Sequence, residues 1–112
     1  MYRFDAPPFF VNAEYLRNRV LTLVDAAEGL RWLVLNAEAW TYLDATAIDV
    51  LTRLHVELEQ RGIALCFARL KGRQREIFEE TGLTARIGRD RFFPTVRAAV
   101  AAFESAHAGD AR

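Results

Sequence analysis

One continuous stretch decides the fold of this 112-residue chain, and from Leu30 to Ala68 it is LRWLVLNAEAWTYLDATAIDVLTRLHVELEQRGIALCFA. Its two ends, residues 30–35 and 63–68, are short and almost continuously apolar, a pattern typical of strands covered on both faces. Between them, apolar side chains recur at the spacing of a helix, which Gly62 ends. The order strand, helix, strand predicts a right-handed βαβ crossover, and therefore a sheet that is at least partly parallel.

The sequence before this stretch predicts two short strands and a helix. Residues 2–4 and 9–11 are aromatic segments separated by two prolines, and they suit an edge hairpin or two short strands. Asn12 is the expected N-cap of a helix whose apolar residues share one face between Ala13 and Ala27. Gly29 follows as its stop signal.

The sequence after this stretch continues the alternation. Residues 72–81 predict a third helix, with Gly82 closing it at the C′ position. Residues 91–93 predict a last short strand, and Pro94–Thr95 then opens a fourth helix. The fold class is therefore α/β, with a mixed central β-sheet of about 4–5 strands flanked by about four α-helices.

Composition predicts a single globular domain, residues 1–108, with a flexible tail at residues 109–112.

Fifteen Lys and Arg residues balance fifteen Asp and Glu residues, so the chain has no net charge that would attract nucleic acid, and nucleic acid is excluded as a partner. The longest apolar runs are far shorter than the ~20 residues that span a bilayer, and the start lacks a signal peptide. Because Cys66 is the only cysteine, the chain is expected in a reducing compartment, the cytosol.

The turn from Asp44 to Ala47 is the first candidate functional site, because it lies where the chain passes from a buried strand into the second helix. Free backbone N–H groups and the helix dipole favour an anion or a phosphorylated Thr46 hydroxyl at this point. The Asp44 carboxylate would repel a phosphate at this point, unless it serves instead to hold a metal ion or to orient the hydroxyl. The simpler interpretation, which we favour, makes Asp44 only the N-cap and Thr46 a first-turn residue.

Four cations form the second candidate, a contact for an anion or a nucleotide at the start of the third helix: Arg69, Lys71, Arg73 and Arg75. Guanidinium groups beside a helix N-terminus would suit phosphate. Three glutamates follow directly, at positions 76, 79 and 80, and the favoured interpretation is a solvated surface network in which they pair with the cations. No glycine-rich phosphate loop is present in the sequence.

The sequence shows no catalytic or metal-binding arrangement, so we predict neither an enzyme nor a cofactor. His55 and His107 fall on different predicted helices. Cys66 lies inside an apolar strand, where a thiol is normally inert. The only serine, Ser105, is in the last helix, near the end of the chain.

Three segments carry a resemblance to the STAS domain, which occurs in anti-sigma-factor antagonists and in SulP (sulfate permease) anion transporters. The opening, from Tyr2 to Tyr15, is very similar to the transporter version of the domain and unlike the antagonists. The segment from Leu33 to Asp49 resembles the STAS turn, which antagonists write as DSSG. The segment from Arg91 to Val96 resembles the transporter phrase that leads into the last helix, so the match covers nearly the whole chain.

The resemblance implies the STAS fold and a non-catalytic role in regulation and protein interaction, as the cytosolic C-terminal domain of a bacterial SulP-type transporter of sulfate or a similar anion. The resemblance also implies a membrane domain upstream of Met1, which would be the main partner of this domain. The domain would then lie at the cytoplasmic face of the plasma membrane. Its further partners would be a second copy of the domain, a cytosolic regulatory protein or a nucleotide. The alternative is a stand-alone antagonist regulated by phosphorylation at Thr46, which aligns with the phosphorylated hydroxyl of DSSG. Ala47 replaces the glycine of that motif, which removes backbone freedom. A small nucleotide-binding domain is the weakest alternative.

Overall fold

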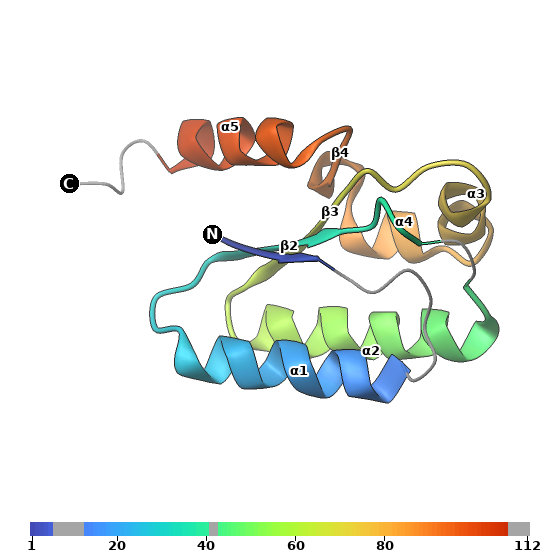
Figure 1. The fold of residues 1–112 in the computed structure, drawn as a ribbon, viewed down its shortest axis with the longest axis horizontal. Coiled ribbons are helices and arrows are strands. Elements are labelled where there is room, and N and C mark those ends of the chain that lie inside the picture. The colour runs from blue at the N-terminus through green and yellow to red at the C-terminus, as the bar shows by residue number, and fades with distance from the viewer. Residues whose placement is uncertain (6–12, 41–42, 108–112) are drawn as a thin grey trace.

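The computed structural model describes residues 1–5, 13–40 and 43–107, along which strands and helices alternate (Figure 1). The elements in chain order are β1 (Tyr2–Asp5), α1 (Ala13–Ala26), β2 (Trp32–Asn36), α2 (Ala45–Gln60), β3 (Ala64–Ala68), α3 (Arg73–Glu80), α4 (Leu83–Ile87), a 3₁₀ turn (Arg89–Arg91), β4 (Phe92–Phe93) and α5 (Val96–Ala106). The predicted α/β class is confirmed, with the strand, helix, strand unit at its centre.

The four strands form one sheet in the order β1-β2-β3-β4, and each neighbouring pair is parallel. Leu33 of β2 stands beside Tyr2 on one side and Leu65 on the other. A mixed sheet was expected, but the three pairs within the described part of the chain are all parallel. The second short strand, predicted at residues 9–11, lies outside the described residues.

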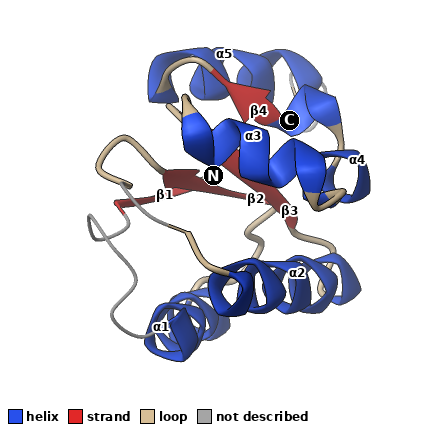
Figure 2. Cartoon of the chain, turned by 90° about the vertical axis from the view of Figure 1, so that its right-hand side faces the viewer, coloured by secondary structure: helices blue, strands red, loops and turns tan. Residues whose placement is uncertain are grey.

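Helices cover both faces of the sheet (Figure 2). Helices α1 and α2 lie side by side under one face, and α5 lies on the other. Alternate residues of a strand point to opposite faces, so β2 and β3 contribute side chains to two separate hydrophobic clusters. The α1–α2 face receives Leu33, Leu35, Leu65 and Phe67, and the α5 face receives Val34, Cys66 and Ala68, which pack with Ala99.

The aromatic ring of Phe67 is the centre of the larger cluster. It is fully buried, and its centroid lies 5.1 Å from that of Phe78 and 5.4 Å from that of Phe92. Phe67 therefore ties α3 and β4, which come later in the sequence, to the middle of the sheet.

The number of helices differs from the expectation, because five helices rather than four occur in the described residues. The additional one, α4, covers only Leu83–Ile87 and contains three buried residues, Leu83, Thr84 and Ile87. It is too short to show a helical period in the sequence. The predicted stop at Gly82 is confirmed: this glycine has φ 80° and donates its N–H to the Glu79 carbonyl, but a new helix begins at the next residue.

The start of α5 follows a capping residue. Thr95 caps α5, because its hydroxyl oxygen accepts a hydrogen bond of 3.0 Å from the Ala98 N–H. The N-cap expected at Asn12 and the tail expected at residues 109–112 lie outside the described residues.

His55 is the one histidine buried within the described part of the chain, with 6% of its surface exposed. Burial is the main cause that lowers the pKa of its imidazole, and the nearby cations Arg91 and Arg86 lower it further, against the opposing charge of Glu59. A hydrogen bond to the backbone of Arg86 also opposes the shift. The fold therefore holds His55 in its neutral form.

This burial predicts a loss of stability at mildly acidic pH. The unfolded chain binds a proton at His55 near the ordinary pKa of about 6.5, whereas the folded chain resists it to lower pH, so the free energy of unfolding falls as the pH drops below about 6.5. One proton contributes a slope of at most about 1.4 kcal/mol per pH unit. Urea denaturation of the wild type and of His55→Leu between pH 7.5 and about 5 measures it. We expect a flatter profile for the variant, and equal slopes for the two proteins would contradict the assignment.

Candidate functional site

The turn that enters α2 is built around Asp44. Its backbone is extended, with φ −102°, and its Oδ1 accepts a hydrogen bond of 2.8 Å from the Ala47 N–H. The Asp44 carbonyl accepts a second bond, 3.1 Å long, from the Ile48 N–H. The Asp44 carboxylate is therefore the N-cap of α2, as its position in the sequence predicted.

Thr46 lies in the first turn of the same helix, and its side chain is exposed. The positive end of the helix dipole favours a negative group at this position. Two carboxylates oppose a phosphate there, because Asp44 caps the helix and Asp49 follows one turn later. The geometry leaves the Thr46 hydroxyl accessible but provides no cation dedicated to a phosphate on the same turn.

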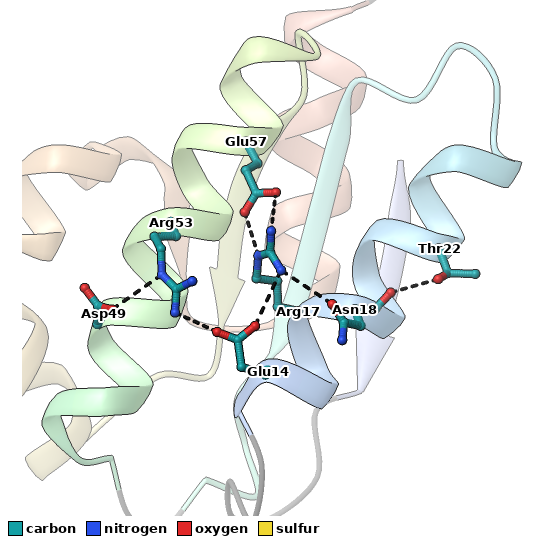
Figure 3. Close-up of polar contacts among 7 residues, drawn as sticks. All are labelled: Glu14, Arg17, Asn18, Thr22, Asp49, Arg53 and Glu57. Atoms are coloured by element: carbon teal, nitrogen blue, oxygen red, sulfur yellow. Dashed lines mark hydrogen bonds and ion pairs between the residues drawn. The ribbon is translucent and has the colours of Figure 1, made fainter.

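The face of α2 beyond Thr46 is tied to α1 by ion pairs (Figure 3). The Arg53 guanidinium lies between Asp49 of its own helix, at 3.4 Å, and Glu14 of α1, at 2.7 Å. The second contact joins residues far apart in the sequence, and it links the start of α1 to the middle of α2. As an exposed pair it contributes about 0–1 kcal/mol.

The pair between Arg17 of α1 and Glu57 of α2 has the better geometry. Two guanidinium nitrogens donate to the two carboxylate oxygens, with Nε–Oε1 2.6 Å and Nη2–Oε2 2.8 Å. These hydrogen bonds lower the pKa of the Glu57 carboxyl and raise that of the Arg17 guanidinium. Both side chains are about one-quarter exposed, so water screens this pair less than those at the surface.

The four cations of the second candidate do not form one site. Arg73 is paired on α3 with Glu76 and Glu80, at 3.1 and 3.2 Å. Lys71 and Arg75 are exposed. The network interpretation thus describes Arg73 well, although the third glutamate, Glu79, pairs with Arg89 instead of a member of the cluster.

Arg69 is separated from the other three. Its Nη1 lies 3.0 Å from the Glu38 carboxylate, and its side chain lines a cavity at the carboxyl ends of β2 and β3. Arg3 and Arg97 line the same cavity, from β1 and α5. These two arginines were missed by the sequence interpretation because they are remote from Arg69 in the chain. Ligands usually bind at the carboxyl ends of the strands in a parallel sheet, and a search for cations near that end could have identified both arginines.

The residues set aside as catalytic candidates lie apart in the fold. Cys66 is completely buried in β3, and burial raises the pKa of its thiol to about 12. His107 stacks on Phe103, with 4.2 Å between ring centroids, at the far end of α5. Among the described residues, no group of three or more His, Cys, Asp and Glu side chains is placed to hold a metal ion. No helix in the described ranges combines the length and hydrophobicity that crossing a membrane requires.

Comparison with known proteins identifies similar sequences over nearly the whole chain. The family model of the STAS domain matches residues 1–99. The probable sulfate transporter Rv1739c of Mycobacterium tuberculosis is 46% identical over 104 residues, which cover 92% of this chain and 19% of that protein. The chain thus spans about one-fifth of the length of these curated relatives.

Solved structures show the same arrangement of elements. The solution structure of the STAS domain of Rv1739c is 38% identical, with a TM-score of 0.51, and the match covers 93% of this chain and 85% of that one. The STAS domain of a SulP transporter from Vibrio cholerae has a TM-score of 0.73 at 24% identity, over 96% of this chain and 82% of the other. The second likeness concerns the fold alone.

The cap at Asp44 generates a prediction about stability. Asp44→Ala removes the acceptor for the Ala47 N–H, and we expect it to lower the free energy of unfolding by about 1 kcal/mol. Asp44→Asn keeps an acceptor oxygen and should retain most of that stability. Chemical denaturation at neutral pH measures both variants. Equal losses in the two would mean that the charge of Asp44, rather than its hydrogen bond, stabilises the helix.

Proposed function

The chain belongs to the STAS domain family, and on this basis we propose that it is the regulatory and protein-interaction domain of a SulP-type anion transporter. The identity of 46% to a probable sulfate transporter, over 92% of this chain, is the observation that carries the proposal. Because the match covers 19% of that relative, transport itself would depend on the remainder of such a protein. The membrane domain of the same transporter is the proposed partner.

The proposed role is one of regulation and interaction, without catalysis by this domain. Residues 1–108 would act as one domain at the cytoplasmic face of the plasma membrane, with α1 and α2 held together on one face of the sheet. The Arg17–Glu57 and Arg53–Glu14 pairs join α1 to α2, so the two helices would offer a partner one continuous surface. The transported anion would be sulfate or a chemically similar ion.

A truncation experiment tests this proposal. The coding sequence upstream of Met1 should contain a series of apolar segments, each about 20 residues long. In cells without sulfate uptake of their own, the full transporter should take up radiolabelled sulfate, and a version that lacks residues 1–112 should take up less. The amount of each protein in the membrane is measured in parallel, so that lower activity is separated from lower abundance.

Two results would contradict the proposal. One is an upstream sequence without apolar segments. The other is uptake that does not change after truncation, at an equal amount of protein in the membrane. A control truncation limited to residues 109–112 should leave uptake unchanged, because that segment lies outside the proposed domain.

A second candidate, a stand-alone regulator switched by phosphorylation, is supported by the exposed side chain of Thr46 at the start of α2. Protein purified from its native cells should then carry one phosphate group, visible by intact mass spectrometry. Thr46→Ala should remove it, whereas the matched variant Thr22→Ala, at another exposed threonine, should keep it. Phosphate that persists in Thr46→Ala, or no phosphate in the wild type, would contradict this candidate.

A further inference from the structure

A cavity of about 730 Å³ opens at the carboxyl ends of β2 and β3, beside the first turns of α5. Its volume is within the range of small-molecule sites. The charged and polar side chains that line it are Arg3, Asn36, Glu38, Arg69, Thr95 and Arg97. Three of the six are guanidinium groups and one is a carboxylate, so the cavity carries a net positive charge in a domain whose total charge is zero.

These side chains come from every layer around the cavity. Arg3 is on β1, Asn36 ends β2, Arg69 follows β3 and Arg97 is in the first turn of α5. Asn36 is only 8% exposed, so its amide forms a polar floor rather than part of the outer surface. Cations separated by dozens of residues meet here because β1 and β3 are parallel members of one sheet and α5 packs beside them.

Arg69 is held at the cavity in an unfavourable backbone conformation. Its φ of 60° is in the left-handed region, where no other described residue except glycine is found. In this conformation the Cβ atom crowds the backbone carbonyl oxygen, so it is unfavourable for a residue with a side chain. Its N–H donates a hydrogen bond of 3.0 Å to the Phe93 carbonyl, which fixes the backbone next to the start of α5.

The Glu38 carboxylate already pairs with one of the guanidinium groups of the cavity, that of Arg69. One of its oxygens lies 3.0 Å from Nη1 of Arg69, while its backbone N–H donates to Oδ1 of Asn36 at 3.2 Å. Glu38 is more than half exposed, so this contact is weak and solvent-screened. An anion from solution can take the place of the carboxylate on Arg69 at little cost.

From this geometry we propose that the cavity is a binding site for a tetrahedral oxyanion, a free sulfate or phosphate ion, in competition with Glu38. Guanidinium groups present paired N–H donors that match the oxygens of such an ion better than they match a spherical halide. The role of the site rests on the proposed function: it senses the anion on the side of the membrane where the domain lies. Binding of sulfate would then report on the supply of the transported ion.

Amide NMR titration of the 112-residue chain with sodium sulfate tests the site, against sodium chloride of equal ionic strength. We expect saturable shifts at Asn36, Arg69, Thr95 and Arg97 with sulfate and not with chloride. Sodium phosphate is the third titrant. Tighter binding of sulfate than of phosphate would identify sulfate, the proposed transported ion, as the ligand. Tighter binding of phosphate would identify phosphate as the ligand. Either order supports an oxyanion site.

Three variants separate this site from general charge effects. Arg69→Gly removes the guanidinium, while glycine accepts the positive φ without strain, so the chain should fold and bind sulfate about tenfold more weakly. Glu38→Gln removes the competitor and should bind about threefold more tightly. The matched control Arg75→Gln changes the net charge by the same amount as Arg69→Gly, on an exposed residue of α3 outside the cavity, and should bind as the wild type does.

Three results would overturn the proposal: no saturable shift with sulfate or phosphate, equal shifts with chloride, or equal weakening by Arg69→Gly and Arg75→Gln. Arg97→Gln provides a second test from α5 and should also weaken binding. The titration does not measure transport, so its failure would leave the proposed function in place. Failure of the truncation experiment would in turn leave the binding result valid and remove only its role in transport.

Discussion

The parallel pairing of β2 with β3 is the constraint on which the rest of the domain depends. Two parallel neighbours need a long connection, and α2 supplies it while covering one face of both strands. The residues that point to this face include Leu33, Leu35, Leu65 and Phe67, all completely buried. Removal of these side chains from water is the main stabilising contribution of the fold. It depends on α2, because α2 covers this face of β2 and β3.

The same parallel direction creates the polar edge of the molecule. Because each strand ends on the same side, the segments after β2 and β3 and the start of α5 meet there, and Glu38, Arg69 and Thr95 come together. The buried side chains on the α5 side, Val34, Cys66, Ala68 and Ala99, are smaller than those on the α1–α2 side, and the larger rings of Trp32 and Phe93 that pack against them are only partly buried. The parallel arrangement of the strands therefore accounts both for the apolar core under α1 and α2 and for the charged cavity at the carboxyl ends of β2 and β3.

Most of the fold could be predicted from the sequence because its elements carry strong local signals. The buried strands are continuous apolar runs, α2 shows a clear helical period, and Thr95 is a recognisable N-cap. The helix α4 could not be predicted, since five residues are too few for a period and its burial depends on contacts with other elements. For the candidate site, Asp44 was correctly interpreted as a cap from its position alone, and the phosphorylation of Thr46 stays a prediction.

The cationic cluster shows where sequence reasoning reaches its limit. Arg69 and Arg73 are close in the chain, yet one pairs with Glu38 at the sheet edge and the other with Glu76 and Glu80 on α3. By itself, the sequence determined the α/β class, the order of the main elements and the family resemblance, because periodicity, caps and motifs are local. Only the tertiary structure decided which charges share a site, because Arg3 of β1, Arg69 after β3 and Arg97 of α5 are brought together by the parallel sheet and by the packing of α5 on it, and not by their spacing in the chain.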